Sequence, residues 1–135
     1  MKNLGIITVL VLLLQAGFSH AQEQTQSRYF KEKLYLQNLI TGIQSENTGL
    51  RRSAIYLAGK YRIAEVNSVL IEAMKAEIDP STRILIALSL YNIGEVSGME
   101  AILNFSHIEK DAKVKRMLTS LYQEYNSHIA AQSSF

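Results

Sequence analysis

The sequence predicts an all-α protein, in the form of a short right-handed α-solenoid of stacked helical pairs. Three observations predict this class. From residue 28 onward apolar residues recur at helical spacing, and the alternation typical of strands is nearly absent. The only proline is Pro80, and the chain has no cysteine, so its stability has to come from packing and oligomerisation, or from a partner, rather than from disulfides. Helix-start signals also recur at a fixed interval, which is typical of stacked supersecondary units.

The N-terminal segment has the pattern of a secretory signal peptide, predicted over residues 1–21. Lys2 precedes an apolar run over residues 4–14, and Ser19 and Ala21 supply the small residues of a cleavage site. The run is shorter than the roughly 20 apolar residues of a membrane span. We therefore expect export to the periplasm or the extracellular space, with no membrane span after cleavage. An uncleaved anchor is the alternative interpretation.

The rest of the chain is predicted to form one domain. Residues 22–27 are polar, lack a hydrophobic period and are predicted to be a flexible lead-in. Residues 28–126 are predicted to form the repeat domain, and residues 127–135 a disordered tail. Within the domain the hydrophobic period predicts helices over 28–44, 48–61, 63–77, 80–93, 97–107 and 112–126.

Helix starts repeat at an even spacing along the chain. The repeated N-cap residues are Asn47, Asp79 and Asp111, and the cations four residues after them are Arg51, Arg83 and Lys115. Pro80 follows its cap at the first helical position, where its missing N–H costs nothing. An anion suits the helix N-terminus, and a cation four residues on can pair with the cap or with the preceding turn. We therefore interpret these six residues as structural caps and pairs; a binding ladder of charges is the alternative.

The helix predicted over 80–93 is apolar on nearly all sides, which indicates a buried helix in the middle of the stack. Only the sector of Leu85, Ser89 and Asn92 is predicted to face water. The helix predicted over 112–126 instead has one apolar stripe opposite a polar face. That pattern is expected of a terminal capping helix.

Two stretches have an Asn or Asp cap at or just before their start, then an arginine, then an Ala-containing helix that ends near a glycine. They are LRRSAIYLAG at 50–59 and DPSTRILIALSLYNIGE at 79–95, with a weaker echo at 111–125. This pattern resembles the bacterial HEAT-like repeats named after phycobilisome lyases. More closely, it is similar to small exported HEAT-repeat proteins of Bacteroidetes-like bacteria. Gly59 and Gly94 are spaced more widely than the caps, so we expect the first repeat to be shorter at its helix end.

No residue pattern indicates catalysis. The chain lacks cysteine, a GxSxG elbow, a Gly-rich phosphate loop and an HExxH pair. His107 stands near Glu109 and Asp111, but this stretch is predicted to be a turn rather than a metal site. The net charge is +2, and Lys2 of the predicted signal peptide contributes one of these charges. So small a positive charge does not indicate a nucleic-acid-binding protein. We therefore expect a non-enzyme with no cofactor, no metal and no nucleic-acid partner.

Two surfaces are candidates for binding another protein. Arg52, Tyr56 and Lys60 are spaced at i, i+4 and i+8 on one face of their predicted helix. The second surface is implied by the resemblance, since the second helix of each HEAT-like pair lines the concave side, where partners commonly dock. Its candidate residues are Glu65, Glu72, Lys75, Glu100, Asn104 and His107. Plain solvated polar residues are the alternative interpretation of both surfaces.

The leading functional hypothesis is a non-enzymatic interaction or scaffold module that offers a rigid repeat surface to another protein. A self-associating structural subunit, and hence a homo-oligomer, is the second hypothesis. Its predicted seam is the stripe of Leu36, Leu39, Ile40 and Ile43. The third is a lyase-like accessory or chaperone for a prosthetic group. That activity needs a ligand-sized cleft with convergent polar groups, and the repeat alone does not carry lyase chemistry.

Overall fold

The computed structural model describes residue 28 and residues 31–132, and no strand occurs among them. The predicted signal peptide and lead-in lie outside the described residues. The chain divides into two compact units, Met1–Gln37 and Asn38–Phe135. In the first unit, residue 28 and residues 31–37 are helical. The described part of the protein is therefore all-α, as the sequence predicts.

The second unit contains the repeated helices. Residues 38–43 are helical and lead through a short turn to α2 (Thr48–Lys60). The elements that follow are a 3₁₀ turn (Ala64–Val66), α3 (Asn67–Ala76), α4 (Pro80–Ile93), α5 (Val96–Ile108) and α6 (Ala112–Gln132). The prediction agrees with these bounds to within a few residues, except at the C-terminal end.

The C-terminal prediction is wrong in its boundary. Helix α6 continues through Gln132, so residues 127–132 are helical rather than a disordered tail, and residues 133–135 lie outside the described part. No glycine or proline interrupts this stretch, and Ala130 and Ala131 are strong helix formers. His128 and Glu124 also lie one turn apart and pair at 3.0 Å.

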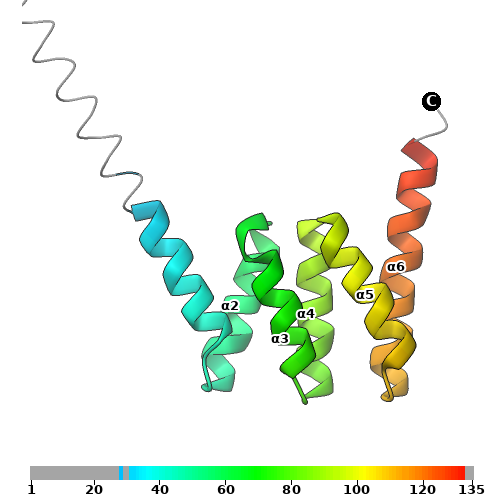
Figure 1. The fold of residues 1–135 in the computed structure, drawn as a ribbon, viewed down its shortest axis with the longest axis horizontal. Helices are drawn as coiled ribbons and strands as arrows, with labels where there is room; N and C mark the ends of the chain where they lie inside the picture. The colour runs from blue at the N-terminus through cyan, green and yellow to red at the C-terminus, as the bar shows by residue number, and fades with distance from the viewer. Residues whose placement is uncertain (1–27, 29–30, 133–135) are drawn as a thin grey trace, which may run out of the picture. The chain divides into compact units, whose positions relative to one another are not determined.

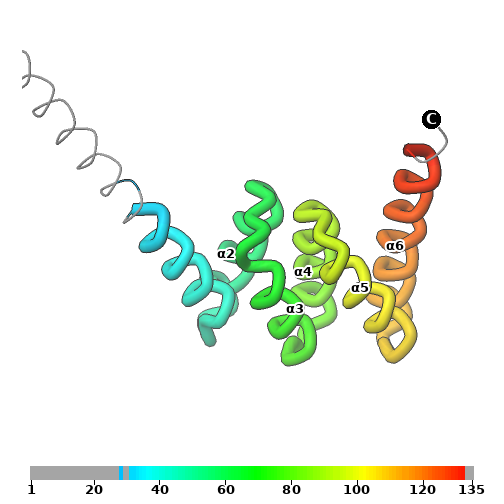
Figure 2. The backbone as a smooth tube through the Cα atoms, turned by 45° about the horizontal axis from the view of Figure 1, so that its top comes forward, coloured from blue at the N-terminus to red at the C-terminus, as the bar shows by residue number. Residues whose placement is uncertain are grey.

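The helices of the second unit form two layers (Figure 1). Helices α2, α4 and α6 pack in sequence in one layer, and α3 packs beside α5 in the other. Helix α4 packs against α2, α3, α5 and α6, and its residues Ile86, Ala87 and Leu90 are fully buried. The view in Figure 2 shows the same succession of helices from α2 to α6. The nearly all-round apolar sequence of α4 is thus explained by its central place.

One residue of the predicted solvent-facing sector of α4 is in the core. Ser89 is buried, and its hydroxyl donates to the backbone carbonyl of Ile55 at 2.9 Å. A Cβ atom on Gly59 would lie 2.6 Å from the Cα of Ser89, so these two small residues let α2 and α4 approach closely. The outward side of α4 instead carries Leu88 and Asn92.

Helix α2 has 13 residues and α4 has 14, so the helix of the first repeat is shorter by one residue, in the direction expected from its glycine. Arg62, with φ 52°, and Gly94, with φ 79°, both adopt the left-handed conformation just after a helix. They are separated by the same interval as the caps Asn47 and Asp79. Gly59 lies inside α2, where the close contact with Ser89 requires a small residue. The repeat therefore keeps its register, but the residue at the left-handed position is arginine in the first copy.

Two residues of the predicted self-association seam are core residues. Leu39 and Ile43 are 6% and 1% exposed within the single chain. These two side chains are therefore not available to a second copy, whereas the other two residues of the predicted seam, Leu36 and Ile40, are half-buried. Helix α6 does match its prediction as a one-sided helix: Val114, Leu118 and Leu121 are buried, whereas Lys115, Arg116, Thr119 and Gln123 are exposed.

Candidate functional site

The predicted cap residues each accept hydrogen bonds at a helix start. The Asn47 side chain accepts from Leu50 N at 3.0 Å, Asp79 from Thr82 N at 2.7 Å, and Asp111 from Val114 N at 2.9 Å. A second acceptor stands two residues before each cap and binds the backbone N–H of the cap residue. These acceptors are Ser45 Oγ at 3.1 Å, Glu77 Oε1 at 2.9 Å and Glu109 Oε1 at 2.8 Å. Each repeat therefore includes a pair of acceptors, one at the cap and one in the turn before it.

The hydrogen bonds at the caps also affect acidity. The Thr82 hydroxyl and then the Thr82 N–H lower the pKa of Asp79, since they stabilise its carboxylate. The N–H groups of Val114 and then Lys113 do the same for the pKa of Asp111, against an opposing effect of burial. Both shifts are explained by helix capping, and neither requires a catalytic role.

Among the described residues no ion pair joins a cap to the cation four residues after it. The alternative prediction, a contact with the preceding turn, is confirmed for Arg51, which donates to the carbonyls of Ser45 at 2.8 Å and Glu46 at 3.4 Å. Arg51 Nε donates to Glu77 Oε2 at 3.2 Å, and Arg83 Nη1 lies 2.8 Å from Glu109 Oε2. Each arginine thus reaches the acidic side chain that orders the next turn, where a carboxylate would otherwise be buried without a counter-charge. Among the described residues no ion pair is formed by Lys115.

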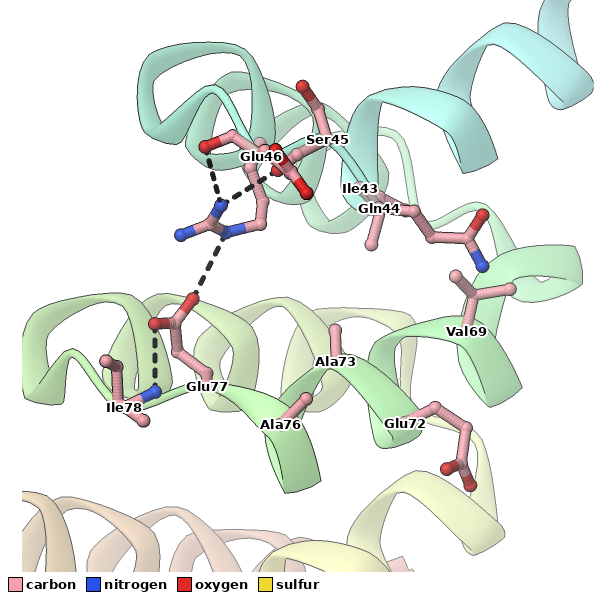
Figure 3. A pocket seen from close by; sticks show the side chains of 11 residues that line it. Ile43, Gln44, Ser45, Glu46, Val69, Glu72, Ala73, Ala76, Glu77 and Ile78 are labelled. Carbon is pink, nitrogen blue, oxygen red and sulfur yellow. Dashed lines mark hydrogen bonds and ion pairs between the residues drawn. The ribbon is translucent and has the colours of Figure 1, made fainter.

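A first hollow, which we call the N-terminal groove, lies between the turn at residues 43–46 and α3 (Figure 3). Its volume is about 480 Å³. Val69 and Ala73 point from α3 toward the turn, and Ile78 stands at the edge with 87% of its surface exposed. Arg51 holds one end by donating to the carbonyl of Ser45 at 2.8 Å. The groove combines an apolar floor with charged ends.

A second hollow, the central groove, lies between α3 and α5 and has a volume of about 320 Å³. Three of the predicted surface residues line it together: Lys75, Glu100 and Asn104. Apolar side chains share the lining, including half-buried Phe105 and Ile108, which is 70% exposed. This mixture of apolar area and convergent polar groups is typical of a contact surface.

Helix α3 separates the two grooves as a ridge. Glu72 lines the N-terminal groove and Lys75 the central groove, and their side chains pair at 2.5 Å. We call the two grooves and this ridge the grooved face. Glu65 is exposed in the 3₁₀ turn and His107 is exposed on α5, and neither lines these two grooves.

The predicted stripe on α2 divides into two parts. Arg52 Nη1 donates to Thr82 Oγ1 at 2.8 Å and lies 3.5 Å from Asp79 Oδ2, so it ties α2 to the start of α4. Tyr56 is 52% exposed, and Lys60 Nζ lies 5.8 Å from its ring centroid and 5.5 Å from that of Tyr61. Tyr61 was not among the predicted residues, although its position directly after Lys60 was a usable signal.

Within the described part of the chain, no group of three or more His, Asp or Glu side chains is arranged to hold a metal ion. Likewise, none of the helices described is both long and apolar enough to cross a membrane. No family model, curated protein or solved structure matches this chain.

Proposed function

We propose that this protein is an interaction module that binds another protein across the grooved face. The observation that carries the proposal is the convergence of Lys75, Glu100 and Asn104 in the central groove beside exposed apolar area. A protein partner can cover the apolar area and use the polar groups to fix its orientation. The ridge of α3, with a groove on each side, extends this surface beyond a single hollow.

We further propose that the second unit is a short right-handed solenoid of HEAT-like repeats. Two features support this: the layered order of the helices and the cap motif that recurs with every repeat. Stacked repeats produce extended surfaces without a catalytic cleft, which suits binding better than chemistry. The signal-peptide pattern of residues 1–21 supports a role at the periplasm or outside the cell.

The proposal is tested by site-specific photo-crosslinking in the native cells. A photoreactive residue is placed at Asn104 in the central groove and, as the matched control, at exposed Thr119 on α6. We expect one protein to be crosslinked from position 104 and not from position 119. The charge reversals Lys75→Glu and Glu100→Lys should each abolish that product, whereas Lys113→Glu should leave it unchanged.

Three results would overturn this proposal. Equal crosslinking from both positions would show that the grooved face is not selective. A product made only of a second copy of the chain would favour the self-associating subunit. A small molecule that copurifies and blocks the crosslink at Asn104 would instead favour an accessory role in the chemistry of a prosthetic group.

A further inference from the structure

A cluster of two tyrosines and two cations lies at the C-terminal end of α2, and none of its residues lines either groove. It consists of Tyr56, Lys60, Tyr61 and Arg62, which we call the corner patch. Both tyrosines are large exposed side chains, at 52% and 60% of their surface. Two cations and two exposed aromatic rings therefore occupy one short stretch of the chain, residues 56–62.

Lys60 contacts two aromatic neighbours. Its ammonium lies 5.8 Å from the ring centroid of Tyr56 and 5.5 Å from that of Tyr61, within the range of a cation–π contact. The two rings limit the freedom of a side chain that is otherwise costly to immobilise. A ligand that meets this ammonium therefore loses less conformational entropy than it would at an unrestrained lysine.

Arg62 occupies a position that favours glycine. It follows α2 with φ 52°, and the hydrogen bonds Arg62 N to Gly59 O at 3.2 Å and Ile63 N to Ala58 O at 3.0 Å form a Schellman motif. The equivalent position of the next repeat is Gly94. An arginine here carries a conformational cost that glycine does not. The helix end itself gives no reason for an arginine side chain.

The charges of the corner patch are not neutralised within the described part of the chain. Neither Lys60 nor Arg62 forms an ion pair there, whereas Arg51, Arg52 and Arg83 all do. The patch thus offers two open cations next to exposed aromatic area. This is complementary to a partner that carries carboxylates beside an apolar or aromatic side chain.

We propose that the corner patch docks an acidic segment of a partner protein. Lys60, whose ammonium lies near both tyrosine rings, binds one carboxylate, and Arg62 binds a second or forms a bidentate pair with the same one. A membrane surface is disfavoured because basic clusters that bind anionic lipid typically hold about four to eight Lys or Arg, whereas this patch has two. The inference is independent of the grooved face.

The test uses the purified full chain and a fluorescein-labelled oligoglutamate peptide with interspersed phenylalanines, followed by fluorescence anisotropy. An oligolysine peptide of the same design is the charge-reversed probe. We expect binding of the acidic probe alone and weakening by salt. Lys60→Gln and Arg62→Gly should each weaken binding about two- to fivefold, the size expected of one exposed charge pair. Arg116→Gln removes an exposed cation from α6 and is the matched control.

Arg62→Gly makes the test sharp because glycine is the favoured residue at this backbone position. The variant should fold at least as well as the parent, so a loss of binding cannot be attributed to unfolding. Unchanged binding by Arg62→Gly would overturn the proposal, as would an equal loss in Arg116→Gln. Binding to phosphatidylglycerol vesicles without binding to the acidic peptide would also overturn it, in favour of a lipid surface.

Discussion

Arg83 Nη1 lies 2.8 Å from Oε2 of Glu109, whose side chain is only 3% exposed. Arg51 and Glu77 repeat this relationship at 3.2 Å, with the same separation along the chain. Each glutamate also accepts the backbone N–H of the cap residue two positions later. The Glu77 carboxylate thus links the arginine of α2 to the start of α4, and the Glu109 carboxylate links the arginine of α4 to the start of α6.

Loss of the arginine should therefore destabilise the fold. We expect Arg83→Met to lower the free energy of unfolding by about 2 to 3 kcal/mol, because it leaves the Glu109 carboxylate buried without its counter-charge. The value lies at the low end for a broken buried pair, since Arg83 itself is 23% exposed. Urea unfolding followed by circular dichroism measures the change. Lys115→Met is the control at the equivalent position of α6, with an expected change within about 0.5 kcal/mol. Similar losses in the two variants would contradict the prediction.

Alanine at Gly59 should lower the free energy of unfolding, whereas alanine at Gly49 should raise it. A Cβ at Gly59 would lie 2.6 Å from the backbone of Ser89, so Gly59→Ala forces α2 and α4 apart and should cost about 2 kcal/mol. A Cβ at Gly49 would meet only the Asn47 side chain, at 3.4 Å. Gly49→Ala should therefore gain up to about 1 kcal/mol from helix propensity. Thermal unfolding measures both variants, and a tolerated Gly59→Ala would show that the helix contact is not tight.

Stability in acid should depend on Asp79 and Asp111. Their pKa values are lowered in the folded protein by hydrogen bonds that the unfolded chain lacks, so the unfolded state takes up protons first as the pH falls. The stabilisation is fully present above the unfolded pKa and is lost as the pH falls through the folded pKa. Urea midpoints measured from about pH 6 to about pH 2 should therefore decline on the acid side.

The double variant Asp79→Asn, Asp111→Asn separates the contribution of helix capping to stability from that of the carboxylate charge. Asparagine is also a good N-cap, so most of the stability at neutral pH should be retained, but the acid decline should become shallower. Asn47→Asp is the converse control, because it adds a titrating cap and should make the decline steeper. If the urea midpoint declined equally steeply with falling pH in the parent and the double variant, these carboxylates would not govern the pH dependence.

The caps and the helices could be predicted because their causes are local. Asn47, Asp79 and Asp111 act on N–H groups two or three residues away, and a hydrophobic period identifies a helix without any knowledge of its neighbours. The arginine–glutamate pairs depend instead on tertiary structure, because the turn before α4 has to pack against α2, and the turn before α6 against α4. Their signal was nevertheless in the sequence, since Glu77 and Glu109 are spaced by the same interval as the caps that follow them.

Other features required knowledge of the neighbouring helix. Polar Ser89 was predicted to face water, but a hydroxyl can equally be satisfied by a carbonyl of an adjacent helix, here that of Ile55. The grouping of Lys75, Glu100 and Asn104 in one groove depends on the packing of α3 beside α5. A helical wheel of one helix predicts that these side chains are exposed, but it cannot predict that they line the same groove.

The repeat-equivalent residues Arg62 and Gly94 provide the last prediction, a reciprocal pair of substitutions. Arg62→Gly should raise the free energy of unfolding by about 1 kcal/mol, because glycine adopts a positive φ without the Cβ penalty. Gly94→Ala should lower it by about 1 to 2 kcal/mol for the same reason. Urea unfolding of both variants checks the sign, with Gly49→Ala as a glycine substitution at negative φ. A destabilised Arg62→Gly would mean that the arginine side chain stabilises the helix end, and the case for its retention as a binding residue would then fail.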